Sequence, residues 1–212
     1  MVVAVKARLG VLHALRLRGF GEVDRIAEVL GDSSAEVAPV LAGLAAADRA
    51  LVTYRPGPVL GGWTLTAEGR AEGARLLAEE LIRCGMRAEV AAVYEEFRAL
   101  NRSFLCLCTR WQLRDRTTIN DHSDSDYDAG VIEELVSIDA RTRPLVEVLS
   151  ATLPRFGHYR TRFDVARSRV EAGDRDWFAK AMIDSYHTVW FELHEDLLAT
   201  LGLERATESD SS

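Results

Sequence analysis

The chain has 212 residues, 48% of them hydrophobic, so it is long enough to bury a core and to form one or two domains. No stretch approaches the roughly 18 to 20 uncharged apolar residues that a membrane helix needs. The apolar N-terminal stretch carries Lys6, Arg8, Arg16 and Arg18, and no small-residue cleavage site follows it, which argues against a signal peptide. We therefore expect a cytoplasmic protein with no membrane partner.

The formal net charge of −7 is unevenly distributed along the chain. Residues 1 to 83 hold ten basic and ten acidic side chains, so the remaining residues carry the whole negative charge. Neither part has the basic surplus that is typical of a strong nucleic-acid binder. The three cysteines are too few and too unevenly spaced to indicate a disulfide framework, and we interpret them as buried free thiols: Cys84, Cys106 and Cys108.

Hydrophobic periodicity predicts three helices in the first fifty residues. The first covers residues 5 to 18, and the second covers residues 23 to 30, where apolar side chains recur at the i, i+3, i+4, i+7 spacing before Gly31. Ser33 and Glu36 have the spacing of a capping box, in which each side chain satisfies a free backbone N–H at a helix start. A third helix is therefore expected over residues 35 to 47.

The period then changes to that of strands. Residues 50 to 54 and 59 to 65 are β-prone, and the turn-forming residues 55 to 58 separate them. Thr66 is placed to cap a further helix that has Glu68 in its first turn. Three helices, a hairpin and another helix predict a winged helix-turn-helix domain over residues 1 to 83.

The end of the third helix (residues 44 to 52) and the segment from Trp63 to Arg70 resemble the winged-helix core of MarR-type transcriptional regulators. In that family the second strand of the wing commonly runs into a Leu-Thr-x-x-Gly-Arg segment, which is Leu65 to Arg70 here. The resemblance covers about residues 8 to 80. It implies a regulator that binds double-stranded DNA and forms a homodimer.

The predicted recognition helix departs from that family. Reading base edges directly needs Arg, Lys, Asn or Gln, and residues 35 to 47 contain none of them. In MarR-type proteins the positions around Ala38, Pro39 and Gly43 are usually polar or basic. Contact with phosphates remains open, and the candidate DNA-binding residues are Arg25, Ser33, Ser34, Arg49 and Arg55. The alternative is that these arginines are ordinary solvated surface.

Residues 84 to 205 read as a second, all-helical domain for dimerisation or ligand sensing, followed by a disordered tail over 206 to 212. We expect a nearly continuous helix over residues 66 to 100, broken near Gly85. Further helices are expected over 103 to 113, 131 to 153 with a kink at Pro144, 164 to 172, and 177 to 201. The fold class is therefore mainly α.

Two polar segments of the second domain are candidate ligand-binding elements. The loop over residues 120 to 128 has an EF-hand-like start, but Ala129 and Leu135 stand where the glycine and the last carboxylate belong, so we interpret it as an aspartate-rich N-cap and expect no metal. Polar and aromatic side chains of this loop and of a later helix could line a cavity. The candidate ligand-binding residues are Trp111, Asn120, His122, Tyr186, His187, Trp190 and His194. The alternative for the last four is a core stripe with hydrogen-bonded histidines.

The chain shows no Gly-rich phosphate loop, no HExxH and no nucleophile elbow, so we expect neither an enzyme, nor catalytic residues, nor a cofactor. The leading hypothesis is a transcriptional regulator whose helical domain dimerises or senses a small-molecule effector. The alternative is a winged helix that binds proteins and not DNA. Residues 120 to 122 and 185 to 196 resemble helical segments of actinobacterial winged-helix proteins, some of which accompany phosphoenolpyruvate-utilising enzymes.

Overall fold

The computed structural model describes residues 2 to 57 and 61 to 203, and from residue 6 onward their side chains. It is mainly helical, with one small antiparallel sheet, and it divides into two compact units. The first unit comprises Met1–Gly85 and Glu195–Ser212, and the second comprises Met86–His194. No helix in the described part of the chain is both long enough and apolar enough to cross a membrane.

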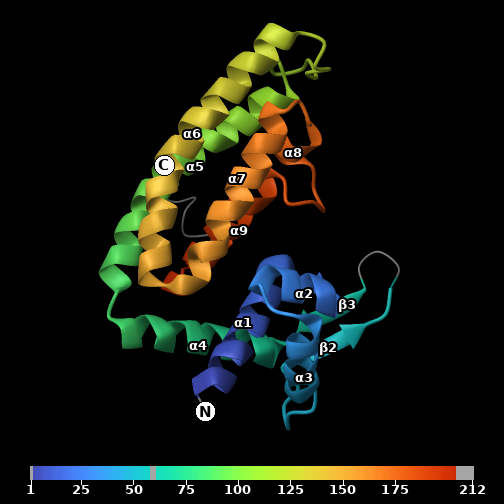
Figure 1. The fold of residues 1–212 in the computed structure, drawn as a ribbon, viewed down its shortest axis with the longest axis vertical. Coiled ribbons are helices and arrows are strands. Elements are labelled where there is room, and N and C mark those ends of the chain that lie inside the picture. The colour runs from blue at the N-terminus through green and yellow to red at the C-terminus, as the bar shows by residue number, and fades with distance from the viewer. Residues whose placement is uncertain (1, 58–60, 204–212) are drawn as a thin grey trace. The chain divides into compact units, whose positions relative to one another are not determined.

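The first unit combines helices with a three-stranded sheet (Figure 1). Its strands pair in the order β1-β3-β2, all antiparallel, with Phe20 opposite Thr64 and Val52 opposite Leu65. The two-residue strand β1 was not predicted, because a segment this short carries no periodicity. In chain order the elements are α1 (Val2–Arg18), β1 (Phe20–Gly21), α2 (Val23–Leu30), α3 (Ser34–Ala45), β2 (Val52–Arg55), β3 (Gly62–Leu65) and α4 (Ala67–Cys84).

The helix ends of the first unit follow the capping signals in the sequence. Helix α2 ends at Gly31, whose φ of 70° is left-handed, and Ser33 forms the expected capping box with Glu36 at the start of α3. Thr66 caps α4 by accepting from the amide of Gly69 at 3.0 Å. A side chain at Gly69 would collide with the carbonyl oxygen of Leu51, because its Cβ would lie 1.9 Å away. The predicted stop at Gly31, the capping box of Ser33 and Glu36, and the cap at Thr66 are thus confirmed.

The core of the first unit joins α1, α2, α3, the sheet and α4. Ala199, near the end of α9 (Tyr186–Leu201), belongs to the same core. His13 Nε2 of α1 also lies 2.9 Å from Asp196 Oδ1 of α9, and both side chains are buried. The C-terminal helix therefore contributes to this unit, whereas the sequence assigned everything after residue 84 to the second domain; the tail predicted over 206 to 212 lies outside the described residues.

The second unit is all-helical. Helices α5 and α6 run side by side along most of their length (Figure 1). Helix α9 packs its first half on α5 through Trp190, whose ring stacks on Phe97 and Phe104 with centroids 4.7 and 4.4 Å apart. The elements are α5 (Arg87–Gln112), α6 (Ser125–Thr152), η1 (Pro154–Gly157), α7 (His158–Glu171), α8 (Asp176–Ala179) and the part of α9 up to His194.

Four predictions for the second unit are wrong in their boundaries. The helix expected over 164 to 172 is α7, which begins at residue 158. Residues 103 to 113 are the continuation of α5, and α6 begins at Ser125 and runs through Pro144. Pro144 is exposed, so water can solvate the carbonyl group that loses its partner. The helix expected over 177 to 201 is broken between α8 and α9. The backbone of Lys180 is extended, which ends α8, and the hydroxyl of Ser185 caps the new helix by accepting from the amide of Thr188.

The cysteines also differ from expectation. Only Cys108 is buried, and burial raises the pKa of its thiol to about 12. Cys84 and Cys106 are exposed, so the prediction of buried thiols is wrong for them. Cys106 and Cys108 lie two residues apart on α5, a spacing that puts them on different faces of the helix.

Candidate functional site

The exposed face of α3 consists of small residues without hydrogen-bonding side chains. Val37, Leu41 and Leu44 point into the core of the first unit. The residues exposed on the other side are Ala35, Ala38, Pro39, Ala42 and Gly43, with Glu36 in the first turn. This face offers no donor to a base edge and carries a negative charge at the end where a recognition helix meets DNA.

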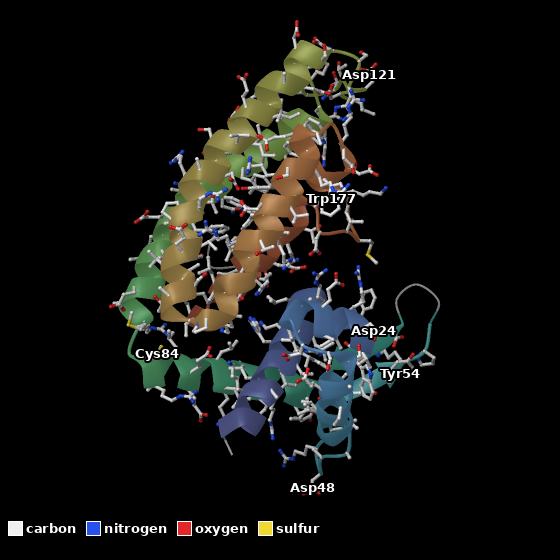
Figure 2. The ribbon with its side chains drawn as sticks, in the orientation of Figure 1. Asp24, Asp48, Tyr54, Cys84, Asp121 and Trp177 are labelled. Carbon is white, nitrogen blue, oxygen red and sulfur yellow. The ribbon has the colours of Figure 1, made fainter. Side chains whose placement is uncertain are left out.

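The two serines at the start of α3 are engaged within the protein. The backbone amide and hydroxyl of Ser33 donate to Glu36 Oε2 at 2.9 and 2.7 Å, and these bonds lower the pKa of that carboxyl. The hydroxyl of Ser34 donates to Asp24, which projects from α2 (Figure 2). Two carboxylates therefore stand at this helix terminus and would repel a phosphate, although the macrodipole alone would attract one.

The three candidate arginines of the first unit are all exposed. Arg25 is paired with Glu28 of the same helix at 2.9 Å, so its charge is largely compensated. Arg49 lies between α3 and β2, and Arg55 ends β2. Next to Arg55, the ring of Tyr54 packs edge-on against Trp63 (Figure 2). Of these three arginines, Arg49 and Arg55 are not paired with a carboxylate of any described residue, so we consider them the candidates for contact with an anion.

A pocket of about 530 Å³ opens in the second unit. It lies where the end of α5, the loop over residues 113 to 124 and the short helix α8 meet. Its volume is in the range of small-molecule sites. The lining residues are Trp111, Gln112, Ile119, Asn120, His122, Arg175, Asp176, Ala179 and Lys180.

A buried hydrogen-bond network forms one wall of this pocket. The side-chain amide of Asn120, which is 4% exposed, donates to the Trp111 carbonyl at 3.1 Å and to Asp128 Oδ1 at 2.9 Å. Its oxygen accepts from the backbone amide of His122 at 3.2 Å. The imidazole Nδ1 of His122 lies 3.0 Å from Asp128 Oδ2, and Asp128 is itself buried. Asn120 therefore positions both members of a His–Asp pair.

The same contacts fix which ring nitrogen of His122 carries the proton when the ring is neutral. The side-chain nitrogen of Asn120 also lies 3.2 Å from His122 Nδ1, but it has only two hydrogens, and the Trp111 carbonyl and Asp128 Oδ1 lie closer to it at 3.1 and 2.9 Å. A carboxylate only accepts, so Nδ1 must be the donor in the bond to Asp128. Nε2 then keeps its lone pair, which makes it the basic atom of the ring.

His122 is held in an unusual backbone conformation. Its φ of 61° is left-handed, a region that residues other than glycine seldom occupy. Arg175 stabilises it by donating from Nη2 to the His122 carbonyl at 2.9 Å, across 53 residues of sequence. The His122 ring packs on Trp111 with centroids 4.4 Å apart, and the Trp111 ring also stacks nearly parallel on Phe178 with centroids 4.3 Å apart. Local strain of this kind is common at binding sites.

The loop that carries the site is organised by its own acidic residues. Asp115 accepts from the amides of Thr117 and Thr118 at 2.9 Å each, which lowers its pKa to about 2. Asp124 caps α6 by accepting from the amide of Tyr127 at 3.0 Å, as the sequence predicted for this aspartate-rich segment. Asp121 lies on the same loop (Figure 2). Among the described residues, no group of three His, Cys, Asp or Glu side chains is arranged to hold a metal ion.

Three of the seven predicted ligand-binding residues line this pocket, namely Trp111, Asn120 and His122. The other four do not. Tyr186 is fully buried and donates to Asp139 Oδ1 at 3.2 Å, and Trp190 Nε1 donates to Asn101 at 2.8 Å. These two, with His187 and His194, form an aromatic core against α5, and burial lowers the pKa of His187. Their packing is that of the core stripe given as the alternative, although His187 itself is only half-buried.

Sequence reasoning missed the basic side of the pocket. Lys180 comes from the start of the helix expected over residues 177 to 201, and Arg175 lies just before that helix. Nothing in the spacing of these two residues points to Asn120. Asp128 was considered only as a calcium ligand or helix cap. No protein-family model matches the chain, and neither a curated protein nor a solved structure matches it.

Proposed function

We propose that this chain is a regulator of the transcription-factor type, with a winged helix-turn-helix in its first unit and a small-molecule site in its second. The observation that carries the proposal is the element order α1-β1-α2-α3-β2-β3-α4 with the strand order β1-β3-β2. Winged-helix domains have helices, a hairpin wing and a recognition helix in this arrangement. The likeness is one of fold, and many winged helices act on other partners.

DNA contact in this proposal comes from phosphates. Helix α3 offers no base-reading side chain, so affinity comes from Arg49 and Arg55 and carries little sequence information. Residues 1 to 83, which hold the proposed winged helix, have no net charge, and a single copy would bind weakly. A homodimer would double the number of contacts by occupying two half-sites, and we propose that state for the functional protein. The pocket at His122 would take up the effector.

The test is binding of the whole chain to duplex DNA of random sequence while the salt concentration is raised. We expect the logarithm of affinity to fall linearly with the logarithm of salt, with a slope of about −0.9 for each phosphate neutralised. Replacing Arg49 and Arg55 with Gln should make that slope shallower by about 2. The matched control is Arg141→Gln in α6, an exposed arginine of the second unit, which should leave the slope unchanged.

A second candidate function is favoured by the start of α3. Glu36 and Asp24 place negative charge where a phosphate would sit, and the rest of the exposed face is Ala, Pro and Gly. Such a surface suits contact with a protein better than contact with DNA. If the whole chain does not bind duplex DNA even at about 20 mM salt, where screening is weak, the winged helix is a protein-interaction module.

A further inference from the structure

Helix α9 is shared between the two units. Its residues 186 to 194 belong to the second unit, and residues 195 to 201 belong to the first. The first part is held by polar bonds: the indole N–H of Trp190 donates to Asn101 of α5 at 2.8 Å, and the hydroxyl of Tyr186 donates to a carboxylate of α6 at 3.2 Å. The second unit therefore orders the helix that continues into the first.

The end of α9 is tied to the first unit by a buried pair and an apolar contact. Oδ1 of Asp196 lies 2.9 Å from Nε2 of His13 on α1, and both side chains are buried. The hydroxyl of Thr200 donates to the same carboxylate oxygen at 3.2 Å, one turn further along α9. Ala199 belongs to the hydrophobic core of the first unit. The end of α9 thus takes part in that core through both polar and apolar side chains.

Helix α1 is covered on two sides. Val11 and Leu15, which lie four residues apart, belong to the core cluster of the first unit. His13 and Leu17 are also four residues apart, and a rotation of about 100° per residue places them on the opposite side of the helix. Both are buried, although neither belongs to that cluster. Because Asp196 meets His13 there, the end of α9 contributes to the cover of this second side.

The end of α9 is too short to form a stable helix by itself, since it spans only about two helical turns. Isolated helices shorter than about 12 to 15 residues are marginal in water, because nucleation fixes more backbone angles than the first hydrogen bonds offset. The segment is helical because it continues residues 186 to 194, which the second unit holds. It therefore meets α1 as a preformed helix.

We propose that residues 195 to 201 are a clasp on α1: the first unit has its full stability only while this segment is docked, and its release loosens the first unit while the second stays folded. The second unit supplies the clasp already formed, because it orders the first part of α9. The inference concerns the stability of the first unit, and it does not depend on whether that unit binds DNA or a protein.

The experiment is amide hydrogen exchange followed by NMR, in which each amide reports the opening of its own region. It compares a chain that ends at His194 with a control chain that ends at Leu203 and keeps every described residue. In the shorter chain the protection of the core amides of Leu12 and Leu41 should fall by about tenfold or more, whereas the amide of Leu135 in α6 should keep its protection within about threefold.

Point variants of the buried pair test the clasp at full chain length. Asp196→Ala leaves His13 Nε2 without this partner in a buried place, so the protection of the Leu12 amide should fall by about tenfold or more. His13→Ala should have a similar effect, and the double variant should lose less than the product of the two single factors, because the pair is broken only once. The control is Arg16→Ala, exposed on the same helix, which should change protection by less than about threefold.

Equal protection of the Leu12 and Leu41 amides in the two chain lengths would overturn the inference. So would single-variant factors that simply multiply in the double variant, because the pair would then not be what docks α9 on α1. If the chain that ends at His194 loses protection in both units, the point variants decide. In that case Asp196→Ala must loosen the first unit and spare the amide of Leu135, and an equal loss in both units would overturn the inference.

Discussion

Helix α3 and the pocket of the second unit differ in how they use polar groups. The exposed face of α3 is nearly free of them, and the few at its start are satisfied by the capping box and by Asp24. One wall of the pocket is formed by the buried Asn120 and the half-buried His122, both hydrogen-bonded to the buried Asp128. Buried polar groups are costly unless they are satisfied, so a network of this kind specifies one geometry. We therefore place selective recognition, as part of the proposed function, in the second unit.

The comparison has a consequence for how the two units would work together. A surface such as α3 tolerates changes in its partner, because it makes few directional bonds. If the pocket binds a small molecule, as we propose, its ligand would have to match the polar groups of Gln112, His122 and Arg175. If the chain is a regulator, its response to a small molecule is specified more sharply than its target on DNA.

The largest expected effect comes from removing the carboxylate at the centre of the pocket network. Asp128→Ala leaves the Asn120 amide and the His122 Nδ1–H without their acceptor in a buried place. We expect a loss of about 3 kcal/mol in the free energy of unfolding of the second unit. The measurement is denaturant unfolding followed by hydrogen exchange, which separates the two units.

The control for that prediction is Asp126→Ala, in the same first turn of α6. Asp126 is exposed and should lose less than about 0.5 kcal/mol. Equal effects from the two substitutions would mean that charge at the start of α6 matters, and that the buried network does not.

The next effect concerns the other surface. Ala42 is exposed on α3, so Ala42→Arg should leave the stability of the first unit nearly unchanged. If the face of α3 lies against DNA, the new guanidinium should steepen the salt dependence of binding by about 0.9 in slope. Salt titration of the variant beside the parent chain measures this. An unchanged slope would place α3 away from the duplex.

Most of the first unit could be predicted because its signals are local. The capping box of Ser33 and Glu36, the stop at Gly31 and the cap at Thr66 each involve residues within a few positions of one another. Residues that satisfy a helix end are constrained by the backbone itself, so neighbouring residues suffice to find them. The short strand β1 was not predicted, because it pairs with residues of β3 that lie more than forty positions away in the sequence.

The candidate site could be predicted only in part, because some of its residues are far apart in the sequence. Asn120 and His122 stand out as polar residues within a loop, and Trp111 precedes that loop. Arg175 and Lys180, which flank α8, reach the pocket from a distant segment, and the helix expected from residue 177 was to continue through residues 180 to 185. Hydrophobic periodicity carries through that break, so the pattern alone does not reveal it. Tyr186 and Trp190 belong to the core. Polar-aromatic residues on one helix face give the same sequence pattern in a core as in the lining of a cavity.

A smaller effect tests whether the start of α3 is occupied by its own cap. Ser33→Ala removes the hydroxyl from the capping box and should lower the free energy of unfolding of the first unit by about 1 kcal/mol. Ser34→Ala should cost less, because Ser34 lies inside the helix and bonds only to the exposed Asp24. Thermal unfolding of the two variants gives the comparison. A larger loss for Ser34→Ala would contradict the assignment of Ser33 as the cap.

The smallest effect is confined to the loop of the pocket and depends on pH. The pKa of Asp115 is lowered from 3.8 to about 2 because its carboxylate accepts from the amides of Thr117 and Thr118. A group with a lowered pKa stabilises the folded loop above about pH 4, and this stabilisation is lost as the pH falls toward about 2. The amide signals of Thr117 and Thr118 should therefore shift in NMR spectra between these values.

Asp115→Asn separates the charge from the hydrogen bonds in that transition. The amide oxygen of Asn still accepts from Thr117 and Thr118, but it has no proton to gain, so the shift of the two signals should disappear. If the transition persists in this variant, another carboxylate of the loop, Asp121 or Asp124, is responsible, since the pKa of each is also lowered by hydrogen bonds. The carbonyl of Thr118 accepts from the backbone amide of Arg114 at 2.9 Å, and the next residue, Ile119, lines the pocket. Loosening this turn at acid pH should therefore also weaken binding of a ligand in the pocket.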